Sequence, residues 1–323
     1  MNKQDIEKLK EMIDTTKYIR FIKLGEKGKF EIKCLEDESN MVLGFREVKH
    51  TAVLDKDLIR ETYLKQGKSK QTASSYYNQI EKFYDEDTLW ITFYGQKLWW
   101  GFADNCDIKK DDENYTFKKM TSGWYSTDLK GNTLTFENIS GVLLKTQMFQ
   151  GTICDIKNKN ESDFKIEDYI KRLLKGEKLN SVMEAEKNIE NMKESIIKMI
   201  QLLQPKDFEY LIDLIFQYSG WKKLTQGGGV EKWLDLDLLM PLTNERAFVQ
   251  IKSETTQKEY DDHETYFYNC DELYNRMFYV VHTLKDKLQI HKSSKPIHIL
   301  EVENIAELVI ELGLINILMK KVG

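Results

Sequence analysis

The chain has 323 residues, 41% of them hydrophobic and 31% charged, and is therefore long enough for two folded domains of ordinary size. Its sequence has no apolar run of the roughly 18 residues that a membrane-spanning helix needs, and its charged first twenty residues are typical of a helix, not of a signal peptide. A net charge of -5 excludes a uniformly basic nucleic-acid-binding protein, although local groups of lysines can still bind phosphate.

From Ile19 to about Asp155 the sequence favours strands. Short aromatic-rich segments such as TLWITFYG and KLWWGFAD are separated by glycine and Asp or Asn turns, and KFEIKCLE (29–36) and GVLLKTQMF (141–149) read in the same way. One helix is predicted to interrupt them over Asp55–Tyr84. We therefore expect residues 1–155 to form a compact β-rich domain that resembles a small β-barrel.

Residues 156–204 carry apolar side chains at helical spacing among Lys and Glu, which predicts a helical connector. After Pro205 the pattern is that of an α/β domain, 205–323. It predicts a helix that ends at Gly220, strands near 234–240 and 247–253, a helix over 261–274, strands at 276–284 and 297–302, and a last helix from Asn304. The chain as a whole is expected to be a two-domain α+β protein.

Polar side chains interrupt the two apolar strands LDLDLLM and AFVQIKS. Asp235 and Asp237 lie two residues apart on the first strand, and Gln250 and Lys252 lie two residues apart on the second. Because side chains alternate along a strand, each pair shares one face of the sheet, and a hairpin can bring the pairs together beside Phe248. Taken alone, the acids could cap a strand and Lys252 could extend its ammonium into solvent. Together they predict a polar site on an otherwise apolar face, where burial of such groups is costly unless they are paired or bind an ion.

Acid, amide and ammonium groups in this pattern suit metal-assisted hydrolysis of a phosphodiester. Asp237, Asp235 and Gln250 offer oxygen ligands of the kind that Mg²⁺ (or Mn²⁺) prefers. A bound metal polarises the phosphate and lowers the pKa of a water, and Lys252 can orient that water and offset charge in the transition state. The five histidines show no metal-binding spacing, and the sequence has no P-loop.

The segments DFEYLIDLIFQYSGW, LDLDL and FVQIKS together resemble the PD-(D/E)XK nuclease superfamily, and within it the Mrr-like restriction endonucleases. The resemblance covers Pro205 to the C-terminus. It implies that Lys252 is the motif lysine, that Gln250 takes the position before it, and that Glu209 on the first helix is a further acid near the metal. The metal-binding aspartate is Asp235 or Asp237, and the shorter reach to the hairpin turn favours Asp237.

Two departures from the family pattern bear on the ligands. Gln250 stands where Glu is commoner, although Gln is frequent in the Mrr-like branch, and the acid-glycine turn of the family appears as GGGVEKWLD.

Aromatic residues are concentrated in the N-terminal domain. Trp90, Trp99 and Trp124, with Tyr94, are candidates for the walls of a pocket that stacks a flat base, while the alternative is that these rings form a hydrophobic core. Trp99 and its neighbour Trp100 must point to opposite faces of their strand.

The segments IRFIKLGEKGKFEIKCLE, MVLGFRE and LWWGFAD resemble PUA-type barrels, including EVE-like modules, over residues 18–155. This resemblance implies a pocket for a modified base. Lysines at 65, 68, 70 and 82 form either a solvated helix face or a phosphate contact whose binding would weaken with salt.

These patterns together predict a Mg²⁺-dependent DNA endonuclease that restricts foreign double-stranded DNA carrying modified bases. Cleavage of both strands needs two nuclease domains, so a homodimer on DNA is expected. The alternatives are a protein that only binds modified nucleotides or RNA on a degenerate nuclease fold, and a nuclease for RNA. Four cysteines scattered without a CxxC pair predict reduced thiols and a cytoplasmic protein without membrane attachment.

Overall fold

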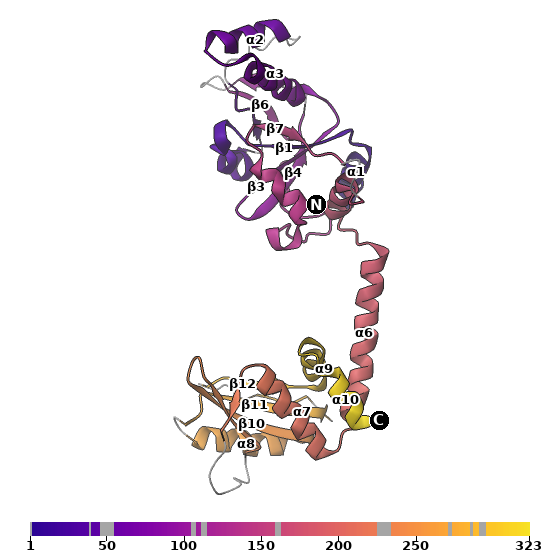
Figure 1. The fold of residues 1–323 in the computed structure, drawn as a ribbon. Helices are drawn as coiled ribbons and strands as arrows, with labels where there is room; N and C mark the ends of the chain where they lie inside the picture. The colour runs from indigo at the N-terminus through magenta and orange to yellow at the C-terminus, as the bar shows by residue number, and fades with distance from the viewer. Residues whose placement is uncertain are drawn as a thin grey trace. The chain divides into compact units, whose positions relative to one another are not determined.

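The computed structural model describes residues 2–38, 40–45, 55–104, 108–110, 115–158, 163–224, 234–270, 273–284, 287–290 and 295–323. The chain is a mixed α+β protein with several open sheets (Figure 1). It divides into two compact units, Met1–Leu179 (unit 1) and Asn180–Gly323 (unit 2). The division between Leu179 and Asn180 falls inside the segment 156–204, for which the sequence predicts a helical connector.

Unit 1 contains a four-stranded and a three-stranded sheet with helices against them. The first sheet has the order β4-β3-β1-β7, with β1 parallel to β3, and the second has the order β2-β6-β5. The strands are β1 (Tyr18–Ile22), β2 (Asn40–Val42), β3 (Thr88–Tyr94), β4 (Lys97–Phe102), β5 (Lys109–Lys110), β6 (Thr116–Lys119) and β7 (Ile153–Asp155). The α-helices are α1 (Lys3–Thr15), α2 (Lys56–Lys65), α3 (Lys70–Tyr84), α4 (Gly141–Leu144) and α5 (Ile166–Lys175).

Two apolar cores lie on the two faces of the four-stranded sheet. One contains α2, α3, Trp90 and Trp124, and the other contains α1, α5 and Trp100. Trp99 packs against the first core while Trp100 belongs to the second, which confirms that these neighbours point to opposite faces. Because α5 is part of a unit 1 core, it is more than a connector.

The expected β-barrel of the N-terminal domain is not formed. Strands β4 and β7 are the edges of the four-stranded sheet and do not pair with each other, so the sheet stays open. The segment 29–36, expected as a strand, leads instead into the π-helix η2 (Lys33–Glu38), because Gly25 and Gly28 turn the chain with φ of 78° and 81°. The segment 141–149, also expected as a strand, is helical in α4 and the short helix η4 (Lys145–Met148). The predicted helix over 55–84 is two helices, α2 and α3, separated at Gly67 with φ of 78°.

Unit 2 is a five-stranded mixed sheet with helices on both faces (Figure 1). Its strand order is β12-β11-β10-β9-β8, in which β10, β11 and β12 are parallel and β9 is antiparallel to β10. The strands are β8 (Lys222–Lys223), β9 (Leu236–Met240), β10 (Glu245–Thr255), β11 (Arg276–Leu284) and β12 (Ile297–Leu300). The helices are α6 (Asn180–Gln201), α7 (Pro205–Tyr218), α8 (Gln257–Asn269), α9 (Val302–Glu311) and α10 (Ile315–Val322).

Alternation along β10 separates the two cores of unit 2. Val249 and Ile251 face a core with α6, α7, α9 and α10, whereas Phe248 faces a smaller core with α8. Gln250 and Lys252 therefore share the α8 side of the strand with Phe248, as the sequence predicts. The predicted order of helices and strands from Pro205 to α9 agrees with the structure except for the short strand β8, which the sequence does not predict.

Candidate active site

The β9–β10 hairpin places the polar residues of both strands on one face. In its register, Asp237 is opposite Phe248 and Leu236 is opposite Val249, so Asp235 and Gln250 are the next pair. The Asp235 backbone N–H donates to the carbonyl of Val249 at 3.1 Å. Asn244, with φ of 57°, supports the turn, since Asn accepts the left-handed conformation more readily than most residues.

Asp235 is bonded to two groups of the neighbouring strand. Its Oδ2 accepts a hydrogen bond from Nε2 of Gln250 at 2.5 Å and another from the backbone N–H of Ile251 at 2.6 Å. The residue keeps exposed surface, but protein surrounds its carboxyl group, and this burial raises its pKa. The bond from Ile251 and the charge of Lys252 lower the pKa in part, whereas the charge of Glu209 raises it further.

Glu209 reaches this group from α7. The helix begins with Pro205 at its first position, and Phe208 and Leu211 bury its inner side in the larger core. Glu209 itself is exposed, and its negative charge raises the pKa of Asp235. This electrostatic effect is the observation that links the two carboxylates.

Gln250 is buried, with 3% of its surface exposed, and the nitrogen and oxygen of its side-chain amide have different surroundings. Its Nε2 donates to Asp235, while its Oε1 is a buried acceptor with no hydrogen-bond partner. Buried acceptors in folded proteins are nearly always satisfied, so an unpartnered one indicates a place for a water or an ion.

Lys252 is partly exposed and acts on two acids. Its charge lowers the pKa of Asp235 and also that of Glu259. Glu259 lies in the first turn of α8, where it forms a capping box with Thr256. The charge of Lys252 therefore acts both on Asp235, before β9, and on the start of α8.

Asp237 has a different environment from Asp235. It is 5% exposed and forms an ion pair with Arg246, whose Nε lies 3.3 Å from its Oδ1 and whose Nη2 bonds its Oδ2. The preference for Asp237 that the hairpin turn suggested gives way to Asp235, because Asp235 is the acid in contact with Gln250 and under the influence of Glu209 and Lys252.

Two residues that the sequence reading did not name lie near this group. Glu259 could have been found from the Thr256-x-x-Glu259 capping-box pattern, which sets the start of α8. Tyr279 on β11 is paired with Gln250 in the sheet register, and its hydroxyl is 2.6 Å from Oγ1 of Thr255. Burial raises the pKa of Tyr279 to about 12, and the charge of Asp235 adds to the shift, so its phenol stays neutral. No sequence pattern marks it.

The four aromatic residues predicted to bind a base lie in or against a core of unit 1. Trp90 and Trp124 are 1% and 7% exposed, and Nε1 of Trp124 donates to the carbonyl of Asn40 at 2.9 Å. Trp99 and Tyr94 are partly buried, and Nε1 of Trp99 donates to the carbonyl of Tyr94 at 3.2 Å. These bonds satisfy the indole groups within the protein.

Unit 1 has a cavity with aromatic walls elsewhere. Its volume is about 530 Å³, and Phe45, Tyr63 and Tyr76 line it with ring centroids 5.0 to 6.3 Å apart. Glu31 lies in the same cavity, and burial raises the pKa of its carboxyl to about 7. Lys23 is a further lining residue.

Three properties of the described residues limit what the sites can be. No group of three His, Cys, Asp or Glu side chains in the described part of the chain could hold a metal ion. The glycine-rich segment Gly227–Gly229 and Cys106 lie outside the described residues, so the expected glycine turn is not seen. Among the helices that the structure describes, none has both the length and the apolar character to cross a bilayer.

Comparisons of the chain with protein family models, with curated proteins and with solved structures return no match. The function therefore has to be inferred from the residues and their geometry.

Proposed function

We propose that unit 2 is a metal-dependent DNA endonuclease of the PD-(D/E)XK type, with Asp235, Glu209, Gln250 and Lys252 as its active site. The observation that carries the proposal is the carboxylate of Asp235, which bonds to Gln250 and to the Ile251 N–H and is under the electrostatic influence of Glu209 and Lys252. The sequence motif predicts these four residues together. Glu209 comes from α7, Asp235 is the residue before β9, and Gln250 and Lys252 come from β10.

The donors present suit Mg²⁺ or Mn²⁺. Two carboxylates and the unpartnered Oε1 of Gln250 are hard oxygen ligands, and Mg²⁺ is commonly bound through one or two carboxylates while it keeps several waters. When bound, the metal would polarise the phosphate and lower the pKa of a coordinated water.

The side chains of the chain have separate roles in the proposed reaction. Asp235 and Glu209 would hold the metal, and Gln250 fixes the Asp235 carboxylate through its Nε2. Lys252 orients the attacking water and offsets negative charge that develops on the phosphate. Asp237 supports the hairpin through Arg246 and does not touch the substrate.

Unit 1 is proposed to recognise the DNA by taking up a modified base, although its sheets do not close into the barrel of PUA- or EVE-like modules. The cavity that Phe45, Tyr63 and Tyr76 line offers open space for a flat ring, which would stack on Tyr76, because Phe45 and Tyr63 are buried like Trp90 and Trp124. Cleavage of both strands would need two copies of unit 2, so the active form is proposed to be a homodimer on DNA. The substrate is foreign double-stranded DNA.

A binding protein without nuclease activity is the second candidate, and one observation favours it. Gln250 turns its nitrogen, not a carboxylate oxygen, toward Asp235, so the site offers less negative charge than two acids and a Glu would. This candidate keeps the role of unit 1 and makes the fold of unit 2 structural.

The test is Mg²⁺-dependent cleavage of unmodified, methylated and hydroxymethylated DNA. Wild type should cut at least one substrate, and Lys252→Ala should lower the rate by about 100-fold or more, as loss of a group that stabilises transition-state charge does. Lys258→Ala removes an exposed lysine of α8 and is the matched control, which should keep full activity. If wild type and Lys252→Ala are equally inactive but retain DNA binding, the nuclease proposal is wrong and the binding protein is correct. Preference for RNA would show the third alternative.

A further inference from the structure

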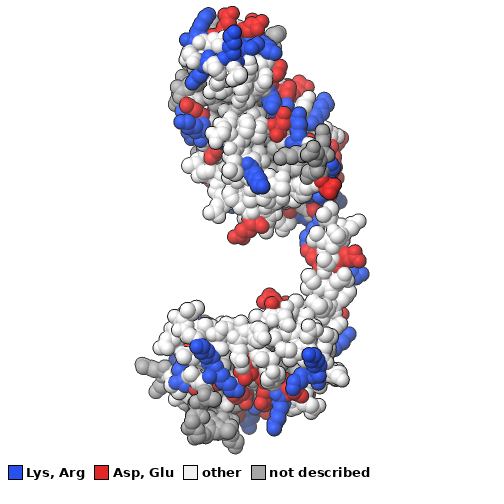
Figure 2. Space-filling view, viewed as in Figure 1, with Lys and Arg blue, Asp and Glu red and all other residues white. Residues whose placement is uncertain are grey.

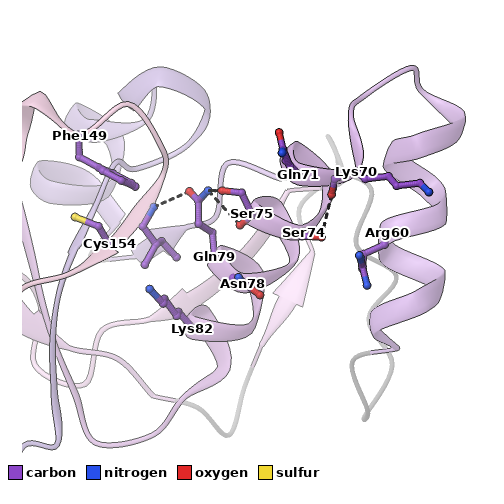
Figure 3. A pocket seen from close by; sticks show the side chains of 11 residues that line it. Arg60, Lys70, Gln71, Ser74, Ser75, Asn78, Gln79, Lys82, Phe149 and Cys154 are labelled. Carbon is purple, nitrogen blue, oxygen red and sulfur yellow. Dashed lines mark hydrogen bonds between the residues drawn. The ribbon is translucent and has the colours of Figure 1, made fainter.

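Unit 1 has a second hollow, built on α3, that the proposed functions leave unused. Its volume is about 690 Å³, and α3, Arg60 of α2 and the segment 149–154 border it (Figure 3). Lys70, Ser74, Asn78 and Lys82 follow each other at four-residue spacing along α3, so they form one line on its surface. The lining residues include three cations and no acid.

The floor of the hollow is fixed by Gln79. This side chain is 7% exposed, and its Oε1 accepts hydrogen bonds from the backbone N–H groups of Thr152 at 2.7 Å and Ile153 at 3.2 Å. Its Nε2 donates to the carbonyl and the hydroxyl of Ser75 at 3.3 and 3.2 Å (Figure 3). Because both ends of the amide are used, α3 is held in place against the segment that leads into β7.

The cations along the hollow differ in how much of their charge is neutralised. Within the described part of the chain, the charged groups of Arg60 and Lys70 take part in no ion pair or hydrogen bond, and only the backbone carbonyl of Lys70 accepts a hydrogen bond from a side chain, that of Oγ of Ser74. Lys82 is 2.9 Å from Oδ2 of Asp155, but Asp155 also binds Arg20, so the acid is shared between cations. The hollow is therefore a basic region in a chain of net charge -5. Figure 2 shows lysine and arginine side chains over α2 and α3, with acids among them.

The remaining groups of the hollow suit a polyanion as well. Asn78 can donate hydrogen bonds to phosphate oxygens between the two lysines, whereas the Ser74 hydroxyl donates to the backbone carbonyl of Lys70 at 2.9 Å. The Cys154 thiol also lines the hollow, and burial raises its pKa to about 11, so it stays neutral and does not repel an anion. From Lys70 to Lys82 the helix rises about 18 Å, at about 1.5 Å per residue, which is long enough to follow several phosphates of one strand.

We propose that this hollow binds the sugar-phosphate backbone of double-stranded DNA, with Arg60, Lys70 and Lys82 contacting phosphates and Asn78 donating to their oxygens. The proposal rests on the proposed function in that it takes DNA as the partner of unit 1. It concerns affinity and not base recognition, since contacts with phosphates position a protein on DNA without reading its sequence.

The test measures binding of the full chain to labelled double-stranded DNA without divalent metal, so that no cleavage occurs, over a range of salt concentrations. Each phosphate contact contributes about 0.9 to the slope of log K against log salt. The double variant Arg60→Gln/Lys70→Gln should therefore lower the slope by about 1.8, which corresponds to about 60-fold weaker binding at about 0.1 M salt if affinities are equal near 1 M. Lys70→Arg keeps the charge and should keep the slope.

Lys3→Gln/Lys8→Gln removes the same number of charges from exposed positions of α1 and is the matched control, which should bind as wild type does. The melting temperatures of all variants should match, because the substituted side chains have no partner that the structure describes. The proposal is overturned if the Arg60→Gln/Lys70→Gln variant and the control lose DNA affinity equally, or if neither loses any. It is also overturned if wild type does not bind DNA, or if it binds RNA more tightly than DNA.

The two proposals can fail separately. DNA binding through the hollow without any cleavage would disprove the nuclease and keep the binding site. Cleavage by a protein whose Arg60→Gln/Lys70→Gln variant binds like the control would keep the nuclease and disprove the binding site.

Discussion

Replacement of Gln250 by Glu tests the contact on which the candidate active site depends. In wild type, Nε2 of Gln250 donates to Oδ2 of Asp235 at 2.5 Å. In Gln250→Glu a second carboxyl group occupies that place, and two buried carboxylates at hydrogen-bond distance cannot both be ionised at little cost. Without metal they should share one proton at neutral pH.

The size of the effect follows from linkage. A glutamate in the unfolded chain has a pKa of about 4.3, and the shared proton raises the folded pKa above that value, so the folded state holds a proton that the unfolded state has released. As the pH rises above about 4.3, for example from about pH 5 to about pH 7, the variant should lose stability relative to wild type, at up to about 1.36 kcal/mol per pH unit. Stability is lost as the pH rises.

Hydrogen exchange of the peptides that cover β9 and β10 is the suitable assay, because it reports unit 2 separately from unit 1. Gln250→Met is the control: it removes the amide without adding a charge, and should cost about 1.5–3 kcal/mol at both pH values. Equal losses for Gln250→Glu and Gln250→Met at both pH values would refute the contact between residue 250 and Asp235. Added Mg²⁺ should restore more stability to Gln250→Glu than to wild type, since it replaces the shared proton.

Three further predictions concern charges in the folded chain. Burial raises the pKa of Glu31 to about 7, so the melting temperature of Glu31→Gln should exceed that of wild type by an amount that grows from about pH 5 to about pH 8, and a constant difference would contradict this. Burial lowers the pKa of Lys118 to about 7, so wild type should gain stability relative to Lys118→Met as the pH rises from about 7 to about 10, as urea unfolding at several pH values can show. Arg246→Met leaves the buried Asp237 carboxylate without its ion-pair partner and should cost about 3 kcal/mol in the same assay. The double variant Arg246→Met/Asp237→Asn should recover much of that loss, and its failure to do so would show that the pair is not coupled.

The sequence predicts unit 2 better than unit 1 because its elements are long and regular. Pro205 at the beginning of α7 and Gly220 just after its end are residues that commonly mark helix termini, and Gly220 has the expected positive φ of 92°. Alternation likewise predicts that Gln250 and Lys252 face α8 with Phe248. These inferences need only local rules.

The choice between the two aspartates could not be made in that way. Alternation places Asp235 and Asp237 on the same face, and only the hairpin register decides that Arg246 pairs with Asp237 while Gln250 meets Asp235. The electrostatic effect of Glu209 on Asp235 could not be predicted from local sequence either, since it depends on how α7 packs against the sheet.

In unit 1 the sequence fails where glycines and packing override alternation. The segment 29–36 alternates like a strand, yet Cys34 and Leu35, adjacent in sequence, are both buried, which a strand with one buried face does not allow. The spacing of the tryptophans along the sequence is compatible both with a binding pocket and with a hydrophobic core. Only the packing of the sheets determines which of these rings are buried. Trp90 and Trp124 are buried in a core of unit 1.

The carboxylate of Asp235 also closes the end of a strand. The backbone N–H of Ile251 points to this side chain and not to a carbonyl of β9, so the acid satisfies an amide that would otherwise lose a partner. A relative of this protein without any catalytic activity would still need an acid or an amide here in order to fold. The persistence of that residue among relatives would therefore be poor proof that they cut DNA, and Lys252, which makes no such bond, would be the better marker.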